Sequence, residues 1–225
     1  MEKDGDRGKE LGELYAEMAR PLGGCLARAM EGTLPAAGIE EVMAGSWEAF
    51  RQVLPDIPDI GGENNPLSED LAGAAFEMGF YALMEARGFS LEAISEIDKK
   101  ATADLARLKI EKAGLETARS FVTDVDSLRW GAEAFRKMGY PDNWAYEVVE
   151  PRPGDSFDIG IDYTRCPIAA LFRKRGMEKF LPYVCENDYP AFAEMGITLE
   201  RTGTIGSGFP VCDFRFRFNE APPCS

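Results

Sequence analysis

The chain has 225 residues, and its 25 Lys and Arg against 39 Asp and Glu give a net charge of −14 at pH 7. An acidic balance of this size repels the phosphates of nucleic acids and of anionic membranes, so neither is an expected partner. The chain also contains no histidine, which excludes imidazole as acid, base or metal ligand. Any chemistry must therefore use thiols, carboxylates, hydroxyls, backbone amides, Arg or Lys.

The first residues of the chain and its cysteines indicate in which cellular compartment we expect the protein. The first residues are charged and lack the apolar core of a signal peptide, and no stretch reaches the roughly 18 apolar residues of a membrane span. The five cysteines are widely spaced without a Cys-x-x-Cys pair, which is typical of free thiols in a reducing compartment. We therefore expect a cytoplasmic protein that acts on a small-molecule substrate, and a homo-oligomer stays open.

The first 140 residues have the pattern of a helical region. Helices are predicted over 9–31, about 39–53, 68–87, 90–110 and roughly 114–138, with a loop over 55–66. Pro21 predicts a kink or break in the first of them. Ser68, followed by Glu69 and Asp70, predicts the N-cap of a helix that is apolar nearly all round and therefore buried at the centre. Ser90 predicts a second N-cap.

From Asn143 the hydrophobic period changes to two, which predicts strands. Strands are predicted over 144–149, 157–163, 198–205 and 211–218, with helices over 167–175 and about 180–195. Short turns between the paired strands make two hairpins and a four-stranded, largely antiparallel sheet. We predict an α+β fold in which a helical N-terminal region, 1–140, packs with an α+β region, 141–225, as one compact unit.

Cys166 is the first of three cysteines in the C-terminal region. It follows a strand and precedes Pro167, which is favoured at the first position of a helix, so Cys166 is the expected N-cap. The helix end and the neighbouring Arg165 would favour a reactive thiolate. Asp162 and Thr164 share one strand face and could line the same opening. A buried thiol at a strand–helix corner is the alternative, and both interpretations stay open.

Cys185 and Asp188 form the second setting. On a continuous helix both lie on one apolar stripe, where burial would raise the pKa of the carboxyl toward a useful acid or base range. Pro190 supports a different interpretation, in which the helix breaks and Asn187 or Asp188 caps a new turn. Spacing alone slightly favours the cap.

Cys212 opens the third setting, an alternating strand. Its side chain shares a face with three phenylalanines, which indicates a core thiol, while Asp213, Arg215 and Arg217 take the other face. The latter three either form an exposed ionic ladder or hold a substrate carboxylate. The spacing of the cysteines does not match a zinc site, and the glycines over 203–208 match a turn better than a phosphate loop.

These motifs occur in an order that resembles one known family. Cys166-Pro167, the Cys-x-x-Asp step 185–188, the Thr-Ile-Gly-Ser-Gly turn 204–208 and Cys212-Asp213-Phe214 resemble the L-2-amino-thiazoline-4-carboxylic acid hydrolase family, specifically over about 160–218. The resemblance implies hydrolytic opening of a thiazoline ring, which gives a carbamoyl-cysteine on a route to cysteine.

From the residues and the resemblance together we predict a hydrolase that opens a cyclic C–N bond in a small sulfur-containing amino acid derivative. Cys166 would be the nucleophile and Asp188 the acid or base, with Cys185, Cys212 and Asp213 completing the site. The substrate-binding candidates are Thr204, the backbone amides near Gly206 or Gly208, and Arg201 or Arg215. No cofactor or metal is predicted. The alternatives are a non-catalytic module that binds a small ligand or soft metal through the same cysteines, and a thiol redox sensor.

Overall fold

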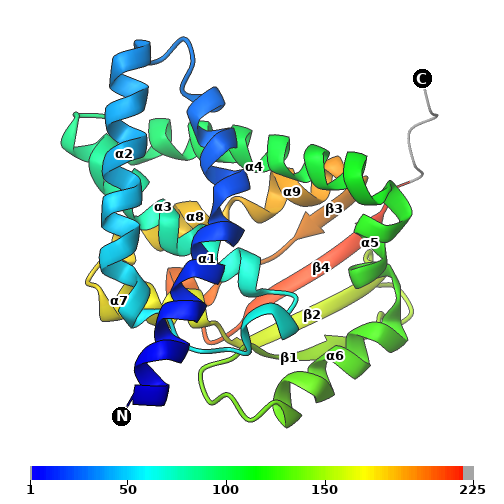
Figure 1. The fold of residues 1–225 in the computed structure, drawn as a ribbon. Helices are drawn as coiled ribbons and strands as arrows, with labels where there is room; N and C mark the ends of the chain where they lie inside the picture. Colours follow the sequence, from blue (N-terminus) through cyan, green and yellow to red (C-terminus); the bar gives the residue numbers. More distant parts are fainter. Residues whose placement is uncertain (1, 220–225) are drawn as a thin grey trace.

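The computed structural model describes residues 2–219, in which a helical half is followed by a sheet with its own helices (Figure 1). The N-terminal helices are α1 (Glu2–Ala29), α2 (Ala36–Val53), α3 (Ser68–Ala86), α4 (Leu91–Ala113), α5 (Leu115–Thr123) and α6 (Val125–Lys137). The C-terminal elements are β1 (Ala145–Val149), β2 (Ile159–Arg165), α7 (Pro167–Lys174), α8 (Leu181–Cys185), α9 (Asp188–Glu194), β3 (Ile197–Glu200) and β4 (Cys212–Phe218). This order confirms the predicted α+β class.

The four strands form one antiparallel sheet in the order β1-β2-β4-β3. Strands β2 and β4 lie at its centre, where Tyr163 is opposite Cys212 and Ile161 is opposite Phe214. Because side chains alternate along a strand, this register puts Tyr163 and Cys212 on the same, inner face. On that face Phe192 of α9 contacts the rings of Phe214 and Phe216, with centroid distances of 6.5 and 4.8 Å.

One hydrophobic core joins the two regions. It extends from Tyr15 of α1 through α3 to Phe216 of β4. Helix α3 is buried on nearly every side, because α1, α2, α4 and α7 all pack against it. In Figure 1 the first three helices gather at one side of the molecule, and the sheet lies beside them. Over residues 2–219 no helix has the length and apolar character needed to cross a bilayer.

Two predicted helices are each divided in the structure. The helix expected over 114–138 breaks at Asp124, whose side chain accepts from the backbone N–H groups of Asp126 and Ser127, both at 3.1 Å. Asp124 is therefore the N-cap that starts α6, a role that a single continuous helix could not give it. The helix expected over 180–195 is also divided, because α8 ends at Cys185 and α9 begins at Asp188.

The predicted helix starts had mixed outcomes. Helix α1 continues through Pro21 without ending there. Ser90 caps α4 as predicted, accepting from the N–H of Ala93 at 3.3 Å. The N-cap prediction for Ser68 was wrong: it is the first residue of α3, and its hydroxyl donates to the carbonyl of Gly62 at 2.7 Å.

Candidate active site

Cys166 occupies the predicted N-cap of α7, with Pro167 at the first helical position. Its sulfur accepts from the backbone N–H of Ala169 at 3.5 Å. Burial nevertheless raises the pKa of the Cys166 thiol to about 12, and the backbone hydrogen bond opposes that rise only in part. The expectation of a thiolate stabilised by the helix end was therefore wrong, since desolvation outweighs the helix terminus here.

The three C-terminal cysteines converge on Asp188. Cys166 interacts electrostatically with Cys212, and Cys185 interacts with Cys166. The carboxylate of Asp188 acts on all three thiols. We name this group, completed by Arg201, the cysteine–aspartate cluster. The sequence predicted its thiols and Asp188 as separate motifs, and the fold brings them together.

Arg201 holds Asp188 in this cluster. Its Nη1 donates to Oδ2 of Asp188 at 2.6 Å, and its Nη2 donates to the backbone carbonyl of Cys185. The guanidinium lies over the rings of Tyr189 and Phe214, at 4.7 and 5.0 Å from their centroids. The Arg201 side chain is 4% exposed, whereas that of Asp188 is 40% exposed. Asp188 is therefore the member of this pair that a small molecule can reach.

The electrostatics of Asp188 balance two effects. Burial among protein atoms raises the pKa of its carboxyl, and the charge and hydrogen bond of Arg201 oppose that rise. The predicted break in the helix is confirmed and Asn187 occupies the N-cap position of α9, but no side chain forms a capping hydrogen bond there. Asp188 instead pairs with Arg201, and Asn187 points into the core.

The turn after β3 fits closely around Cys185. A Cβ atom at Gly206 would lie 2.7 Å from the Cys185 sulfur and 3.3 Å from Cβ of Leu181, so only glycine fits beside this thiol. Burial raises the pKa of Cys185 to about 12, and a hydrogen bond with Thr204 opposes the rise. Thr204 also caps the turn, since its hydroxyl accepts from the N–H of Ser207 at 3.0 Å.

The same turn contacts Cys212 and ends at Gly208. The sulfur of Cys212 accepts from the N–H of Ile205 at 3.1 Å, and burial raises the pKa of this thiol as well. Gly208 adopts a φ of +88°, with open space where a Cβ would stand. Gly206 is thus required by close packing and Gly208 by its backbone conformation.

Asp213 lies on the other side of β4 from Cys212. It accepts from the N–H groups of Thr202 and Gly203, each at 2.9 Å, and from the Thr202 hydroxyl at 2.6 Å. Burial would raise the pKa of Asp213, but these hydrogen bonds outweigh it and lower the pKa. The structure therefore gives Asp213 a role in holding the turn after β3, away from the inner face.

Arg215 is also separated from the thiols. Its Nη1 donates to Asp162 at 2.7 Å, and its side chain packs over Gly160 of the neighbouring strand. The hydroxyl of Thr164 donates to the carbonyl of Ala145 at 3.3 Å. The shared opening expected for Asp162, Thr164 and Cys166 was therefore wrong, and Arg201 is the arginine of the cluster.

Two further residues join the cluster without having been predicted. Asp70, in the first turn of α3, interacts with Asp188, and burial raises its pKa to about 6 although its side chain keeps an exposed surface. Tyr163 interacts with Asp188, Asp70 and Cys166. In the sequence Asp70 matched the ordinary acidic first turn of a helix, and only its position on an otherwise apolar helix distinguished it.

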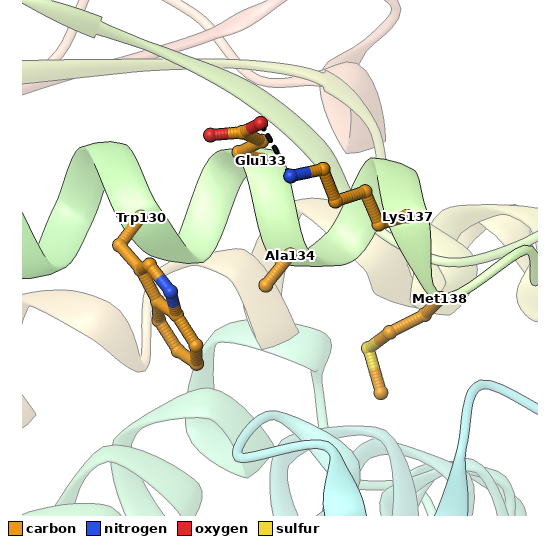
Figure 2. A pocket seen from close by; sticks show the side chains of 5 residues that line it. All are labelled: Trp130, Glu133, Ala134, Lys137 and Met138. Carbon is orange, nitrogen blue, oxygen red and sulfur yellow. Dashed lines mark ion pairs between the residues drawn. The ribbon is translucent and has the colours of Figure 1, made fainter.

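A separate hollow lies on α6, lined by Trp130, Glu133, Ala134, Lys137 and Met138 (Figure 2). Its charged groups are paired, because Lys137 and Glu133 form an ion pair of 2.6 Å. It contains no thiol, and Trp130 at its edge is 73% exposed. Over residues 2–219 no three Cys, Asp or Glu side chains are grouped so as to hold a metal ion. Cys25 is buried in α1, and Cys224 lies outside the described residues.

Comparison with known proteins follows the motifs around the cluster. No curated protein and no solved structure matches the chain at a significant level. A family description for L-2-amino-thiazoline-4-carboxylic acid hydrolase matches residues 71–216. The matched range includes all three converging cysteines, Asp188, Arg201 and the 204–208 turn. The chain therefore belongs to the L-2-amino-thiazoline-4-carboxylic acid hydrolase family.

Proposed function

We propose that the protein is a hydrolase that opens the ring of a small thiazoline-type cyclic amidine, with Cys166 as its nucleophile. The observation that carries this proposal is the convergence of three thiols on a solvent-reachable carboxylate, Asp188, held by Arg201. A chain without histidine must move protons with other groups, and carboxyls with raised pKa values suit this task.

The charges of the cluster match those of an amino-thiazoline acid. An amidine presents a planar pair of N–H donors, and a carboxylate accepts such a pair in a bidentate arrangement. Asp70, with its exposed surface beside Asp188, is the carboxylate that we assign to this role. Arg201 is buried, so its positive charge favours the substrate carboxylate through the electrostatic field and not by direct contact.

The chemical step begins with a neutral thiol, because burial raises the pKa of Cys166. Asp188 accepts the thiol proton as the sulfur bonds to the amidine carbon, which then carries two sulfurs and two nitrogens. The ring sulfur leaves and takes the proton, because a thiol is much more acidic than an amine and its anion is the better leaving group. Water then adds to the carbon, and Cys166 leaves with a proton.

This sequence consumes one water and leaves the carbamoyl group on the ring nitrogen. It breaks the ring C–S bond, so leaving-group chemistry leads us to propose that bond in place of the C–N bond expected from the sequence. The two openings differ in the group released: C–S cleavage gives a free thiol, whereas C–N cleavage gives a free amine. A thiol-reactive dye and an amine-reactive dye applied to the product distinguish them.

The test incubates the purified protein with 2-amino-thiazoline-4-carboxylate and follows the product by mass spectrometry. We expect Cys166→Ala and Asp188→Asn to lose turnover, while Cys25→Ala, which removes a buried thiol far from the cluster in sequence, keeps it. Full turnover by both site variants would end the proposed scheme. Saturable binding without product in the unmodified protein would favour the non-catalytic module instead.

A further inference from the structure

A second polar cluster lies in the core behind the active site. Asn187 donates through Nδ2 to Oε1 of Glu77 at 3.3 Å and to Oδ2 of Asp98 at 2.7 Å. Glu77 belongs to α3 and Asp98 to α4. The exposed fractions of Glu77, Asp98 and Asn187 are 4%, 0% and 8%. One amide therefore joins two carboxyl groups from different helices in a nearly dry environment.

The carboxyl groups of Glu77 and Asp98 both contact Nδ2 of Asn187. The distance between their two contacting oxygens is therefore at most the sum of the two contact distances. Among residues 2–219 no ion pair is formed by Glu77 or Asp98, and the nearby Lys99 pairs with Glu96 and Glu186, at 3.3 and 2.5 Å. Buried carboxylates this close cannot both be ionised, so one proton stays with the pair.

The proton is assigned to Glu77 by its surroundings. Burial first, and then the charge of Asp98, raise the pKa of Glu77 well above its usual value, whereas burial raises the pKa of Asp98 only to about 6. The other groups facing the pair are the Tyr81 hydroxyl, Lys99 and Asp188. Since Asp188 acts on Glu77, any change in the charge of the pair must in turn act on Asp188.

Asn187 connects this pair to the active site through the backbone. It lies between Cys185, the last residue of α8, and Asp188, the first residue of α9. Anchoring its side chain to α3 and α4 therefore fixes both neighbours at once. We propose that Glu77, Asp98 and Asn187 form a proton-sharing clamp that positions Asp188 against the cysteines, an inference that rests on the proposed function for its catalytic meaning.

If the clamp exists, three variants of its residues should behave differently. Glu77→Gln keeps the charge of the pair and replaces the acid O–H by an amide N–H, so its pH profile of kcat/KM should match that of the unmodified protein. The double variant Glu77→Gln with Asp98→Asn removes one negative charge, so the acidic limb of the profile should move down by roughly 1 pH unit. Asn187→Ala releases Asp188, and kcat/KM should fall about 10²-fold.

A stability control separates these effects from loose packing. Val42→Ala shortens a buried side chain of α2, so it should lower the melting temperature without shifting the pH profile of kcat/KM. A purely structural role for the clamp would make the double variant behave as Val42→Ala does. That outcome, or an unchanged kcat/KM in folded Asn187→Ala, would overturn the proposal.

Two measurements need no turnover and therefore stand even if the thiazoline acid is not the substrate. At pH 8 the infrared difference between the unmodified protein and Glu77→Gln should contain the C=O band of a protonated carboxylic acid. The rate at which iodoacetamide alkylates Cys166 and Cys185, followed by mass spectrometry, should change its pH dependence in the double variant only. Absence of the infrared band would refute proton sharing, whereas absence of turnover in the unmodified protein would refute only the proposed function.

Discussion

Gly206→Ala tests whether the turn over 204–208 holds Cys185 in place. The new Cβ would lie 2.7 Å from the Cys185 sulfur, about 1 Å inside a normal contact distance. Either the turn or the thiol must move by that amount. We expect a loss of about 1–3 kcal/mol in the free energy of unfolding. Because a displacement of this size disturbs the reacting groups, kcat/KM should fall about 10²-fold.

A double-mutant cycle with Cys185→Ala makes this prediction specific. Removing the sulfur removes the 2.7 Å contact and leaves the contacts of 3.3 Å with Leu181 and 3.5 Å with Thr204, so Gly206→Ala should cost much less stability in the Cys185→Ala background. Urea unfolding of the four proteins gives the coupling energy. Gly208→Ala is the matched control: its φ of +88° with open space predicts a loss of about 1–2 kcal/mol from backbone strain. Equal costs of Gly206→Ala in both backgrounds would refute the packing explanation.

Three further changes test the electrostatics around the sheet. Arg201→Met removes the cation that opposes the raised pKa of Asp188, so the acidic limb of kcat/KM should move to higher pH; a shift to lower pH would contradict the pairing. Asp213→Ala should lower the free energy of unfolding by about 1 kcal/mol and should also lower kcat/KM, though less than Gly206→Ala does, since its carboxylate holds the turn that packs around Cys185. Because the pKa of Asp213 is lowered, its contribution to stability should be lost as the pH falls through that lowered pKa. For Asp70 the sign is opposite: its pKa rises from 3.8 to about 6, so the native state loses stability as pH rises through that range. Asp70→Asn should abolish this loss in melting curves measured against pH, by an amount reduced by the exposure of the side chain.

The local chemistry of the sequence was enough to predict much of the site. The step from Cys166 to Pro167 predicted an N-cap because proline fits the first turn of a helix, and α7 begins as expected. The alternation from Cys212 onward predicted an inward thiol. That same alternation also puts Asp213 and Arg215 on the opposite face, so their assignment to the site went against a signal already present in the strand.

Other features depend on contacts between distant segments. Arg201, which lies beyond α9, binds both Asp188 and the end of α8, and the local sequence around Asp188 does not predict this contact. Asp70 joins the cluster because its place on α3 lets it interact with Asp188 and Tyr163, which no local pattern encodes. The thiol of Cys166 has both a favourable helix end and an unfavourable burial, and only the packed structure decides which effect is larger.

Buried carboxyl groups with raised pKa values compensate for the absence of histidine in this protein. A protein that moves protons near neutral pH needs groups that titrate there, and imidazole is the side chain that does so without help. Here burial moves carboxyls upward: Asp70 to about 6, with Asp188 and Glu77 raised as well. Each raised carboxyl lies next to another acidic group, so protonating one lowers the pKa of its neighbour. The same low-dielectric surroundings keep the thiols neutral. The nucleophile must therefore lose its proton only as it attacks. The carboxyls, more than the cysteines, are then the groups that set the pH dependence of the reaction.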